Sequence, residues 1–267
     1  LVPGGAANVA YNIASLGSEP VLFGVLGQDS SGEKLINVLK QKNIQTQNLI
    51  KSDEKPTILK SRIVAHQQHI VRVDREDNSC ITQETEKRLK DQLLKQIQDC
   101  DGIILSDYLK GTLTDRLSQF VIKEANKHDK KIIVDPKGQD YMKYQGATLL
   151  TPNFSEFQSV SNQPIRSEET IQEEGLKLIE KLSLNALVVT RSEKGMSILT
   201  EKGEKLDIST QAKDVFDITG AGDSVIGMIT IALASECSLI DACHLANFAA
   251  GNVVAKIGTA ITTLDEI

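Results

Sequence analysis

Short apolar runs alternate with longer amphipathic stretches along most of the chain. The short runs are rich in Val, Ile and Leu, as buried parallel strands are, and each ends near a polar or glycine position. The longer stretches repeat their apolar positions with the 3.6-residue period of a helix. The expected strands span 21–27, 103–107, 132–135, 148–150 and 186–190, and the expected helices span 31–43, 84–100, 115–128, 168–182 and 221 to about 256. This order predicts a doubly wound, mostly parallel α/β sheet flanked by helices.

One segment interrupts the alternation. Residues 57–76 contain two β-rich runs with no helix between them, and residues 66–69 (HQQH) are suited to a turn. We expect a β flap inserted into the α/β domain that spans 1–267. A two-stranded hairpin cannot bury both of its faces by itself, so the flap should cover a site, pair with another chain, or do both.

Composition and charge narrow the class of protein. The 267 residues are 40% hydrophobic and 25% charged, with a net charge of −6, and no Lys-Arg block indicates nucleic-acid binding. The longest apolar run, 225–234, is too short to cross a membrane. The chain opens on a glycine turn rather than a signal peptide, and its four cysteines form no CxxC pair. We therefore expect a cytoplasmic protein with reduced thiols.

The strongest chemical signal is 217-DITGAGDSVIGM-228, where Gly220, Ala221 and Gly222 precede a carboxylate and an apolar helix. Backbone N–H groups and the dipole at a helix start form an anion site, and small residues leave it open to a phosphate. Asp223 would repel that anion, so it suits a base that receives the proton of an attacking hydroxyl. The competing interpretation is a glycine turn with an acid that stabilises the helix dipole. The residues alone favour neither interpretation over the other.

Two other nucleotide-binding patterns are not supported. Residues 27–34 (GQDSSGEK) resemble a Walker A loop, but Glu33 stands where that loop requires lysine. No GxGxxG follows an expected strand, so a Rossmann dinucleotide site has no support either.

Residues 217–224 resemble the C-terminal signature D-T-x-G-A-G-D of the ribokinase, or PfkB, family of carbohydrate kinases. Residues 4–17 (GGAANVAYNIASLG) are similar to the family's N-terminal signature, two glycines followed by an asparagine on a helix. Two signatures in the right order, near opposite ends of the chain, are more specific than either alone. The resemblance covers the whole chain and implies a ribokinase-like fold and a kinase that uses ATP and Mg²⁺.

Four further stretches resemble the heptose-7-phosphate kinases of lipopolysaccharide core synthesis within this family. The resemblance implies phosphorylation of D-glycero-D-manno-heptose 7-phosphate at C1, where the anomeric hydroxyl is more acidic than an ordinary alcohol. Such a kinase is often fused to an adenylyltransferase, which the full-length protein could carry. The stretches are 106–111, 135–138, 148–157 and 189–197.

The resemblance also implies roles on the nucleotide side. Gly220, Ala221 and Gly222 would form the anion hole and Asp223 would be the base. The family's Asn-x-x-Glu element corresponds to Asn153, Phe154, Ser155 and Glu156, which would organise the nucleotide phosphates and, through water, Mg²⁺. The same spacing is that of a capping box, and the residues alone favour that interpretation.

Other nucleotide-side positions are less specific. Thr190 and Arg191 follow an expected strand end, where α/β folds bind ligands, and the family places this loop near the phosphates. Asp217 and Thr219 could help to hold K⁺. Asn247, Ala250 and Gly251 match the helix that lines the adenine pocket, although close helix packing explains these three equally well.

On the sugar side, Gly4, Gly5 and Asn8 match sugar-contacting positions, with a glycine turn and a helix-facing amide as the competing interpretation. A substrate that already carries a phosphate also needs a cationic partner. The candidates are Lys110, Lys137, Arg62 and Arg72, although each flap arginine taken singly is more simply explained as solvated. His66 and His69 have no carboxylate or cysteine partners that would make them a metal site.

The chain departs from the family at its start, because the family's first strand, which ends in a Gly-Asp pair, is not in it. We expect that residues precede Leu1 in the full-length protein, since a central sheet edge would otherwise be unpaired. Family precedent implies a homodimer formed through the flap. The alternatives are a kinase for another sugar, an ATP-dependent dehydratase of the same superfamily and a silent nucleotide-binding module; the intact Asp223 argues against the last.

Overall fold

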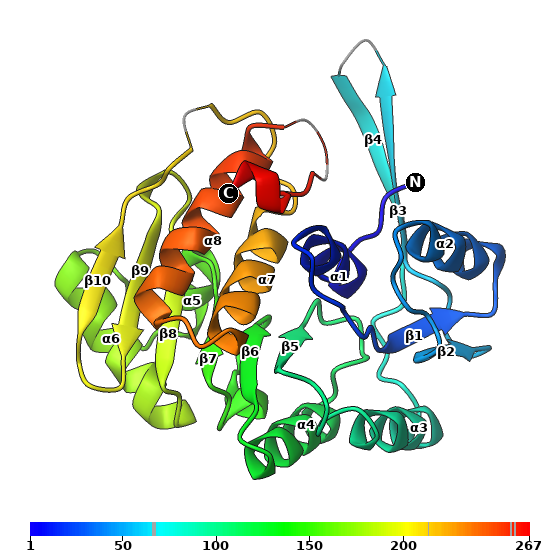
Figure 1. Cartoon of the computed structure of the whole chain (residues 1–267), viewed down its shortest axis with the longest axis horizontal. Coiled ribbons are helices and arrows are strands. Elements are labelled where there is room, and N and C mark those ends of the chain that lie inside the picture. Colours follow the sequence, from blue (N-terminus) through cyan, green and yellow to red (C-terminus); the bar gives the residue numbers. More distant parts are fainter. Residues whose placement is uncertain (66–67, 213, 257, 259) are drawn as a thin grey trace.

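The computed structural model describes residues 1–65, 68–212, 214–256, 258 and 260–267. Its centre is a six-stranded sheet in the order β10-β9-β8-β7-β6-β5 (Figure 1). The strands are β5 (Gly102–Ser106), β6 (Lys131–Asp135), β7 (Leu149–Leu150), β8 (Ala186–Thr190), β9 (Met196–Thr200) and β10 (Lys205–Ile208). The first four run parallel, which confirms the expected sheet, and β9 and β10 add an antiparallel edge that the sequence pattern did not predict.

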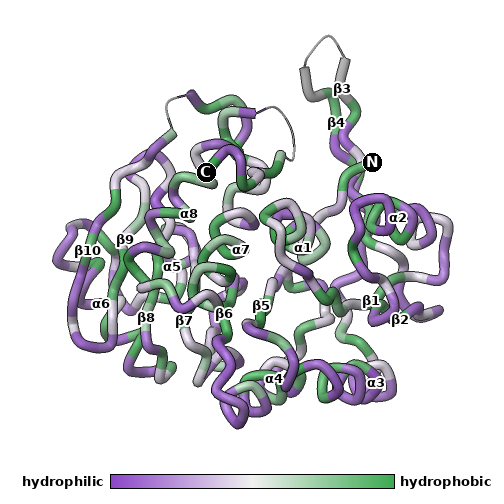
Figure 2. The backbone as a smooth tube through the Cα atoms, viewed as in Figure 1, coloured by the Kyte–Doolittle hydropathy of each residue, from purple (hydrophilic) through white to green (hydrophobic). Residues whose placement is uncertain are grey.

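Helices cover both faces of this sheet. Ile132 and Val134 of β6 pack into one core and Ile133 into the other, so each strand is buried on both sides and reads as a continuous apolar run. The first face carries α3 (Gln83–Leu94), α4 (Asp115–Lys127), α5 (Phe154–Val160) and α6 (Glu168–Leu182). The second carries α1 (Ala6–Ser15), α7 (Ala221–Ala234) and α8 (Leu239–Val254). Figure 2 shows apolar residues concentrated on the strands and α7.

Two helix predictions are corrected at their ends. The 221–256 helix is two helices, because the chain turns after Ala234 and Ser238 caps α8 by accepting a hydrogen bond from the Asp241 N–H at 3.1 Å. The 84–100 helix ends at Leu94, whose side chain is exposed rather than buried, while Leu89 and Ile97 occupy the core. No helix in the described parts of the chain is long and apolar enough to span a bilayer.

A smaller unit lies beside the main sheet. β1 (Gly24–Gly27) pairs in parallel with β2 (Leu49–Ser52), and α2 (Ser30–Gln41) connects them. The flap is the antiparallel pair β3 (Leu59–Ala65) and β4 (Gln68–Arg75), which projects from the body as predicted (Figure 1). Residues 66–67 of the expected turn lie outside the described residues. Three 3₁₀ turns, η1 (Met142–Tyr144), η2 (Ser192–Lys194) and η3 (Leu264–Glu266), complete the elements.

The edges of β1 and β5 face each other across a cleft. Within the described structure, β1 is hydrogen-bonded only to β2, and β5 only to β6. Residues 22–26 and 102–107 both line the cleft, together with apolar side chains of α3 and α4. The main sheet and the β1–β2 unit are therefore separated by a space with free strand edges on both sides.

Candidate active site

The cleft has a volume of about 1450 Å³ and extends from the gap between β1 and β5 to the start of α7. The carboxyl ends of β5, β6 and β8 open into it, as expected for a ligand site in an open α/β sheet. It brings together thirteen of the predicted site residues: Gly4, Gly5, Asn8, Arg62, Arg72, Lys110, Asn153, Glu156, Thr190, Thr219, Gly220, Gly222 and Asp223.

The glycine turn has the geometry of an anion site. Gly220 is the N-cap of α7 with φ 88°, a left-handed conformation that favours glycine, and the helix begins at Ala221. A Cβ on Gly222 would meet no atom within 4 Å, so the space above the helix start is open. Among the described residues no acceptor contacts the N–H groups of Gly222 and Asp223. Two free donors and the helix dipole therefore point at one open position.

Asp223 lies in the first turn of α7 with only 9% of its surface exposed. The Asn8 amide donates to its Oδ2 at 2.5 Å, and the Tyr108 hydroxyl donates to its Oδ1 at 2.8 Å. Burial raises the pKa of Asp223 above its ordinary value, and the two hydrogen bonds oppose that rise. The carboxylate is therefore held from two sides in a cleft open to ligand, which the competing dipole interpretation does not require.

The Asn8 side chain has a second polar atom, Oδ1, that can contact a ligand. Its side chain is 1% exposed, and its Oδ1 has no hydrogen-bond partner within the described structure. A buried amide oxygen without a partner is costly, and Asn8 lines the cleft beside Asp223. The Oδ1 atom is thus suited to accept a hydroxyl of a bound ligand.

Asp135, at the end of β6, is a site residue that sequence reasoning missed. It lines the cleft, and burial together with the carboxylates of Asp223 and Glu156 raises its pKa to about 8. The signal was its place at a strand end two residues before Lys137, where only the lysine was considered. Asp135, Asp223 and Glu156 therefore place three carboxyl groups beside the anion site, and the charges of the other two help to raise the pKa of Asp135.

That charge distribution fits a divalent cation. A cation near Asp135 and Glu156 would relieve the repulsion that raises the Asp135 pKa. Among the described residues no group of three His, Cys, Asp or Glu side chains could hold a metal alone. Mg²⁺ in proteins keeps several waters and takes one or two carboxylates together with substrate phosphates, a donor set that Asp135 and Glu156 fit.

The Asn-x-x-Glu element forms a capping box at the start of α5. The Glu156 N–H donates to Asn153 Oδ1, and the Asn153 N–H donates to Glu156 Oε2, both at 2.9 Å. Glu156 also pairs with Lys137. The capping box is confirmed, and because Asn153 and Glu156 also line the cleft, their contact with phosphates and Mg²⁺ stays a prediction that this geometry permits. Phe154 instead packs against the core, and Ser155 is exposed on α5.

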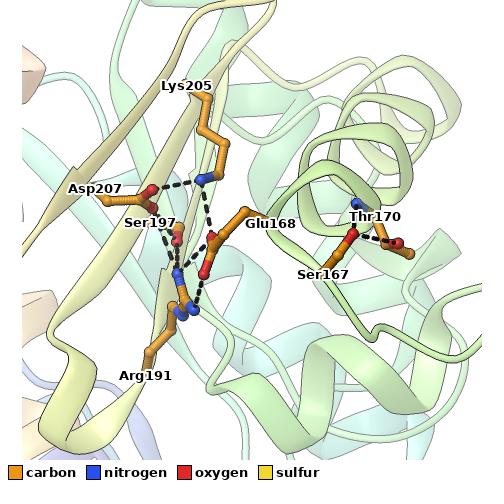
Figure 3. Close-up of polar contacts among 7 residues, drawn as sticks. All are labelled: Ser167, Glu168, Thr170, Arg191, Ser197, Lys205 and Asp207. Carbon is orange, nitrogen blue, oxygen red and sulfur yellow. Dashed lines mark hydrogen bonds and ion pairs between the residues drawn. The ribbon is translucent and has the colours of Figure 1, made fainter.

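Arg191 lies in an ion-pair network outside the cleft lining. Its guanidinium donates to both carboxylate oxygens of Glu168, at 2.9 and 2.5 Å, and to Ser197 Oγ at 2.9 Å (Figure 3). Asp207 and Lys205 complete the network. The Arg191 side chain is 9% exposed and does not line the cleft. It ties the end of β8 to α6 and β10, and of the pair only Thr190 lines the cleft, so the contact of Arg191 with nucleotide phosphates stays a prediction.

The α8 residues show the packing that the sequence left open. Asn247 donates to the Ser209 carbonyl at 2.7 Å, Ala250 packs into the core, and a Cβ on Gly251 would approach the backbone of 211–212 at 3.3 Å. These contacts hold the 209–212 loop against α8. The three residues do not line the cleft, and their contact with adenine stays a prediction.

Asp217 organises the loop before the glycine turn. Its carboxylate accepts from the Thr219 N–H at 2.9 Å and from the Gly258 N–H at 3.2 Å, and these hydrogen bonds lower its pKa. Asp217 therefore joins the 217–220 turn to the chain after α8. Thr219 lines the cleft and Asp217 does not.

The candidate cations differ in how they are engaged. Lys110 pairs with Glu76 at 2.6 Å and Arg72 pairs with Asp74 at 3.0 Å. Arg62 lies opposite Arg72 in the flap register, and both line the cleft. Lys137 is paired with Glu156 and is not among the lining residues. The flap arginines are therefore two of the basic residues that line the cleft, and Arg72 is already paired with Asp74.

A sequence profile of the pfkB family of carbohydrate kinases matches residues 1–266, and the chain belongs to this family. It is 44% identical to the bifunctional protein HldE of Helicobacter pylori (strain P12) over 264 residues, which cover 99% of this chain and 57% of that protein. It is 42% identical to the HldE protein of Geobacter sulfurreducens, with 99% and 54% covered. The chain thus spans little more than half the length of these relatives.

Solved structures confirm the ribokinase-like fold. Phosphofructokinase-2 from Escherichia coli in complex with potassium has a TM-score of 0.83 at 20% identity, with 98% of this chain and 84% of that chain covered. Arabidopsis thaliana ribokinase complexed with ribose and ATP has a TM-score of 0.78 at 19% identity, with 100% and 84% covered. The chain is therefore a carbohydrate kinase by family, and its fold is ribokinase-like.

Proposed function

We propose that this chain transfers the γ-phosphate of ATP to the C1 hydroxyl of D-glycero-D-manno-heptose 7-phosphate, forming the 1,7-bisphosphate for ADP-heptose and lipopolysaccharide core synthesis in the cytoplasm. The observation that carries the phosphoryl transfer is Asp223, held by two hydrogen bonds beside an open helix N-terminus. The choice of sugar is supported by identity to the HldE proteins over nearly the whole chain and by stretches such as 106–111 and 135–138.

The geometry suggests how the residues divide the reaction. The N–H groups at Gly222 and Asp223 bind the transferring phosphate, and Asn8 Oδ1 accepts a sugar hydroxyl. Asp223 receives the proton of the attacking hydroxyl; because phosphoryl transfer is loose, orientation contributes more than base strength. Bound Mg²⁺, held by Glu156 through water with Asp135 nearby, would neutralise charge on the nucleotide phosphates.

The flap provides a place for the 7-phosphate. Arg62 and Arg72 are directly opposite each other on neighbouring strands, so their side chains share one face. That face lines the cleft. Two guanidinium groups on one surface suit the bidentate recognition of phosphate, and Lys110 lies nearby as a third cation.

The opposite face of the flap supports a homodimer. Ile63 pairs with Val71, and Val73 follows on the same face because side chains alternate along a strand. These three side chains are 52%, 46% and 55% exposed. An apolar face on a lone hairpin needs a partner, and a second copy of the flap would supply one through a two-fold interface.

Three further proposals concern the full-length protein and its ions. A strand that precedes Leu1 would fill the space between the free edges of β1 and β5. The length of the bifunctional relatives supports a second, adenylyltransferase domain. K⁺ binding near Asp217 and Thr219 is supported by the loop geometry and by the potassium complex of the structurally similar phosphofructokinase-2.

The deciding experiment is nucleotide turnover with a panel of sugars. ADP release and phosphorylated product should be measured with heptose 7-phosphate, fructose 6-phosphate, ribose and no sugar. We expect stimulation by heptose 7-phosphate alone and a product with two phosphate resonances by ³¹P NMR. Preference for another sugar would support the alternative kinase. ADP release with dehydration and no phosphorylated product would support the dehydratase.

A further inference from the structure

Tyr108 lines the cleft and contacts Asp223 directly. It lies in the loop 107–111, which follows β5 at the carboxyl edge of the sheet. Its hydroxyl donates to Asp223 Oδ1 at 2.8 Å. Its ring lies against Gly5, where a Cβ would come within 3.4 Å of it, so the glycine turn of the N-terminal signature leaves room for this ring.

The loop that carries Tyr108 is held in place by hydrogen bonds to the Asp107 carboxylate. The Lys143 ammonium and the Tyr144 hydroxyl donate to Asp107 Oδ2 at 2.5 and 2.6 Å, and the Leu109 N–H donates to Asp107 Oδ1 at 2.7 Å. Asp107 is 4% exposed. Leu109 has φ 53°, a left-handed conformation that costs energy for a residue with a side chain. The backbone on both sides of Tyr108 is therefore held in one arrangement.

The same loop is joined to the base of the flap. Gly111 has φ 78°, and a side chain there would overlap the Ser79 carbonyl; its own carbonyl accepts from the Ile81 N–H at 3.0 Å. The Lys55 ammonium, which is buried, donates to the Ser79 carbonyl and to the Lys110 carbonyl. The loop thus lies between the flap and Asp223 and contacts both.

We propose that Tyr108 is a positioning residue that keeps the Asp223 carboxylate oriented and ionised for proton acceptance. A phenol is a donor to a carboxylate, and each carboxylate oxygen still has a lone pair for the substrate hydroxyl. Burial and the nearby Asp223 raise the pKa of Tyr108, so it stays protonated and donating over the working pH range. This inference rests on the proposed function, in which Asp223 is the base.

Few other groups could control Asp223. Asn8 on α1 is the second donor and does not titrate. On β6 the titratable groups are Lys131, at the far end of the strand, and Asp135 at the cleft end, whose ionisation would oppose that of Asp223, with Lys137 two residues further on. β5 contributes no acid or base between Gly102 and Ser106, and α8 has Asp241, Cys243 and His244 only in its first half. Tyr108 therefore donates to Asp223 without itself losing its proton in the working pH range. Removing its hydroxyl should change the pH dependence of kcat.

The test compares Tyr108→Phe with Tyr11→Phe, which removes a phenol hydroxyl from α1 outside the cleft. Removing a hydrogen bond to the charged form raises the pKa of Asp223. We expect the acid limb of the kcat profile to move up by about one pH unit, so that kcat falls by up to about tenfold at pH values below that limb. The KM for ATP should stay the same, and Tyr11→Phe should match the wild type.

A second variant guards against a folding defect. Replacing Tyr108 by 3-fluorotyrosine keeps the shape and strengthens the donor, so the acid limb should move down in pH. Superimposable pH profiles of kcat for the wild type, Tyr108→Phe and the 3-fluorotyrosine protein would overturn the inference. A change confined to the KM for the sugar would also overturn it, because Tyr108 would then be a substrate contact. Asp223→Asn is measured in the same experiment. If this variant is fully active, the proposed base is wrong. If it is inactive and the pH profiles of the Tyr108 variants are unchanged, only the inference about Tyr108 fails.

Discussion

At the scale of single residues, Asp223 combines a cost to stability with a proposed catalytic function. Its carboxylate is almost fully buried at the start of α7, and burial raises its pKa against the hydrogen bonds from Asn8 and Tyr108. A carboxyl group whose folded-state pKa is raised destabilises the fold as pH rises through its unfolded pKa and toward its folded pKa. Sites that keep such a group are commonly functional ones.

We therefore expect Asp223→Asn to lower kcat by about 10²–10⁴-fold while ATP binding is retained. The same variant should have a higher melting temperature at pH 7, because an uncharged amide removes the cost of burying the charge. Steady-state kinetics, nucleotide titration and calorimetry check these three results. Near-normal turnover would remove Asp223 from the mechanism.

Glu156 separates the metal interpretation from the capping interpretation. Glu156→Gln keeps an oxygen that can accept from the Asn153 N–H, but it loses the charge that would bind the hydration shell of Mg²⁺. We expect the Mg²⁺ concentration for half-maximal rate to rise by roughly 10-fold. If the Mg²⁺ dependence is unchanged and only the melting temperature falls, Glu156 serves as a helix cap alone.

At the scale of elements, the Arg191 network joins α6 to β8 and β10. The hydrogen bond from Arg191, assisted by Lys205, lowers the pKa of Glu168 to about 2. A depressed carboxylate pKa contributes stability that is present above the unfolded value, near 4.5, and is lost as pH falls toward 2. Half of the Glu168 side chain is exposed, so solvent screening reduces this contribution.

Glu168→Gln should accordingly reduce the free energy of unfolding at pH 7 by about 1 kcal/mol. The difference from the wild type should shrink between pH 4.5 and pH 2, because the wild-type carboxylate is then protonated too. Urea unfolding at several pH values measures this. Glu173→Gln, an exposed position on the same helix, is the matched control and should show no such trend.

At the scale of the whole molecule, the two faces of the flap lead to a test of assembly. Val71→Glu combined with Val73→Glu places charge on the face that points away from the cleft. We expect a monomer by light scattering, because buried unpaired charges oppose association. Sugar-dependent turnover should fall more than basal ATP hydrolysis, since a flap without its partner excludes water less well.

The control for this test is Ile240→Glu, which introduces the same charge at an exposed apolar position on α8. It should leave both assembly and turnover unchanged. A double variant that remains dimeric with normal sugar affinity would show that the flap is neither an interface nor a lid.

The local sequence pattern alone was sufficient to predict many of the strands and helices of this protein. Continuous apolar runs predicted β5, β6 and β8 because these strands are buried on both faces, and the 3.6-residue period predicted α4 and α6 nearly to their ends. The glycine turn before Asp223 carries its own conformational requirement, so it was recognisable without any tertiary contact.

Only the tertiary structure decided how charged side chains are used. Arg191 and Thr190 are neighbours in sequence, yet strand alternation sends one into an ion-pair network and the other into the cleft. Tyr108 meets Asp223 across 115 residues, and Asp135 acquires its raised pKa from carboxylates on other elements. Such pairings depend on distances between elements, which no local pattern encodes, so the sequence determined the fold class and the candidate base, Asp223, while the packing decided what surrounds that carboxylate.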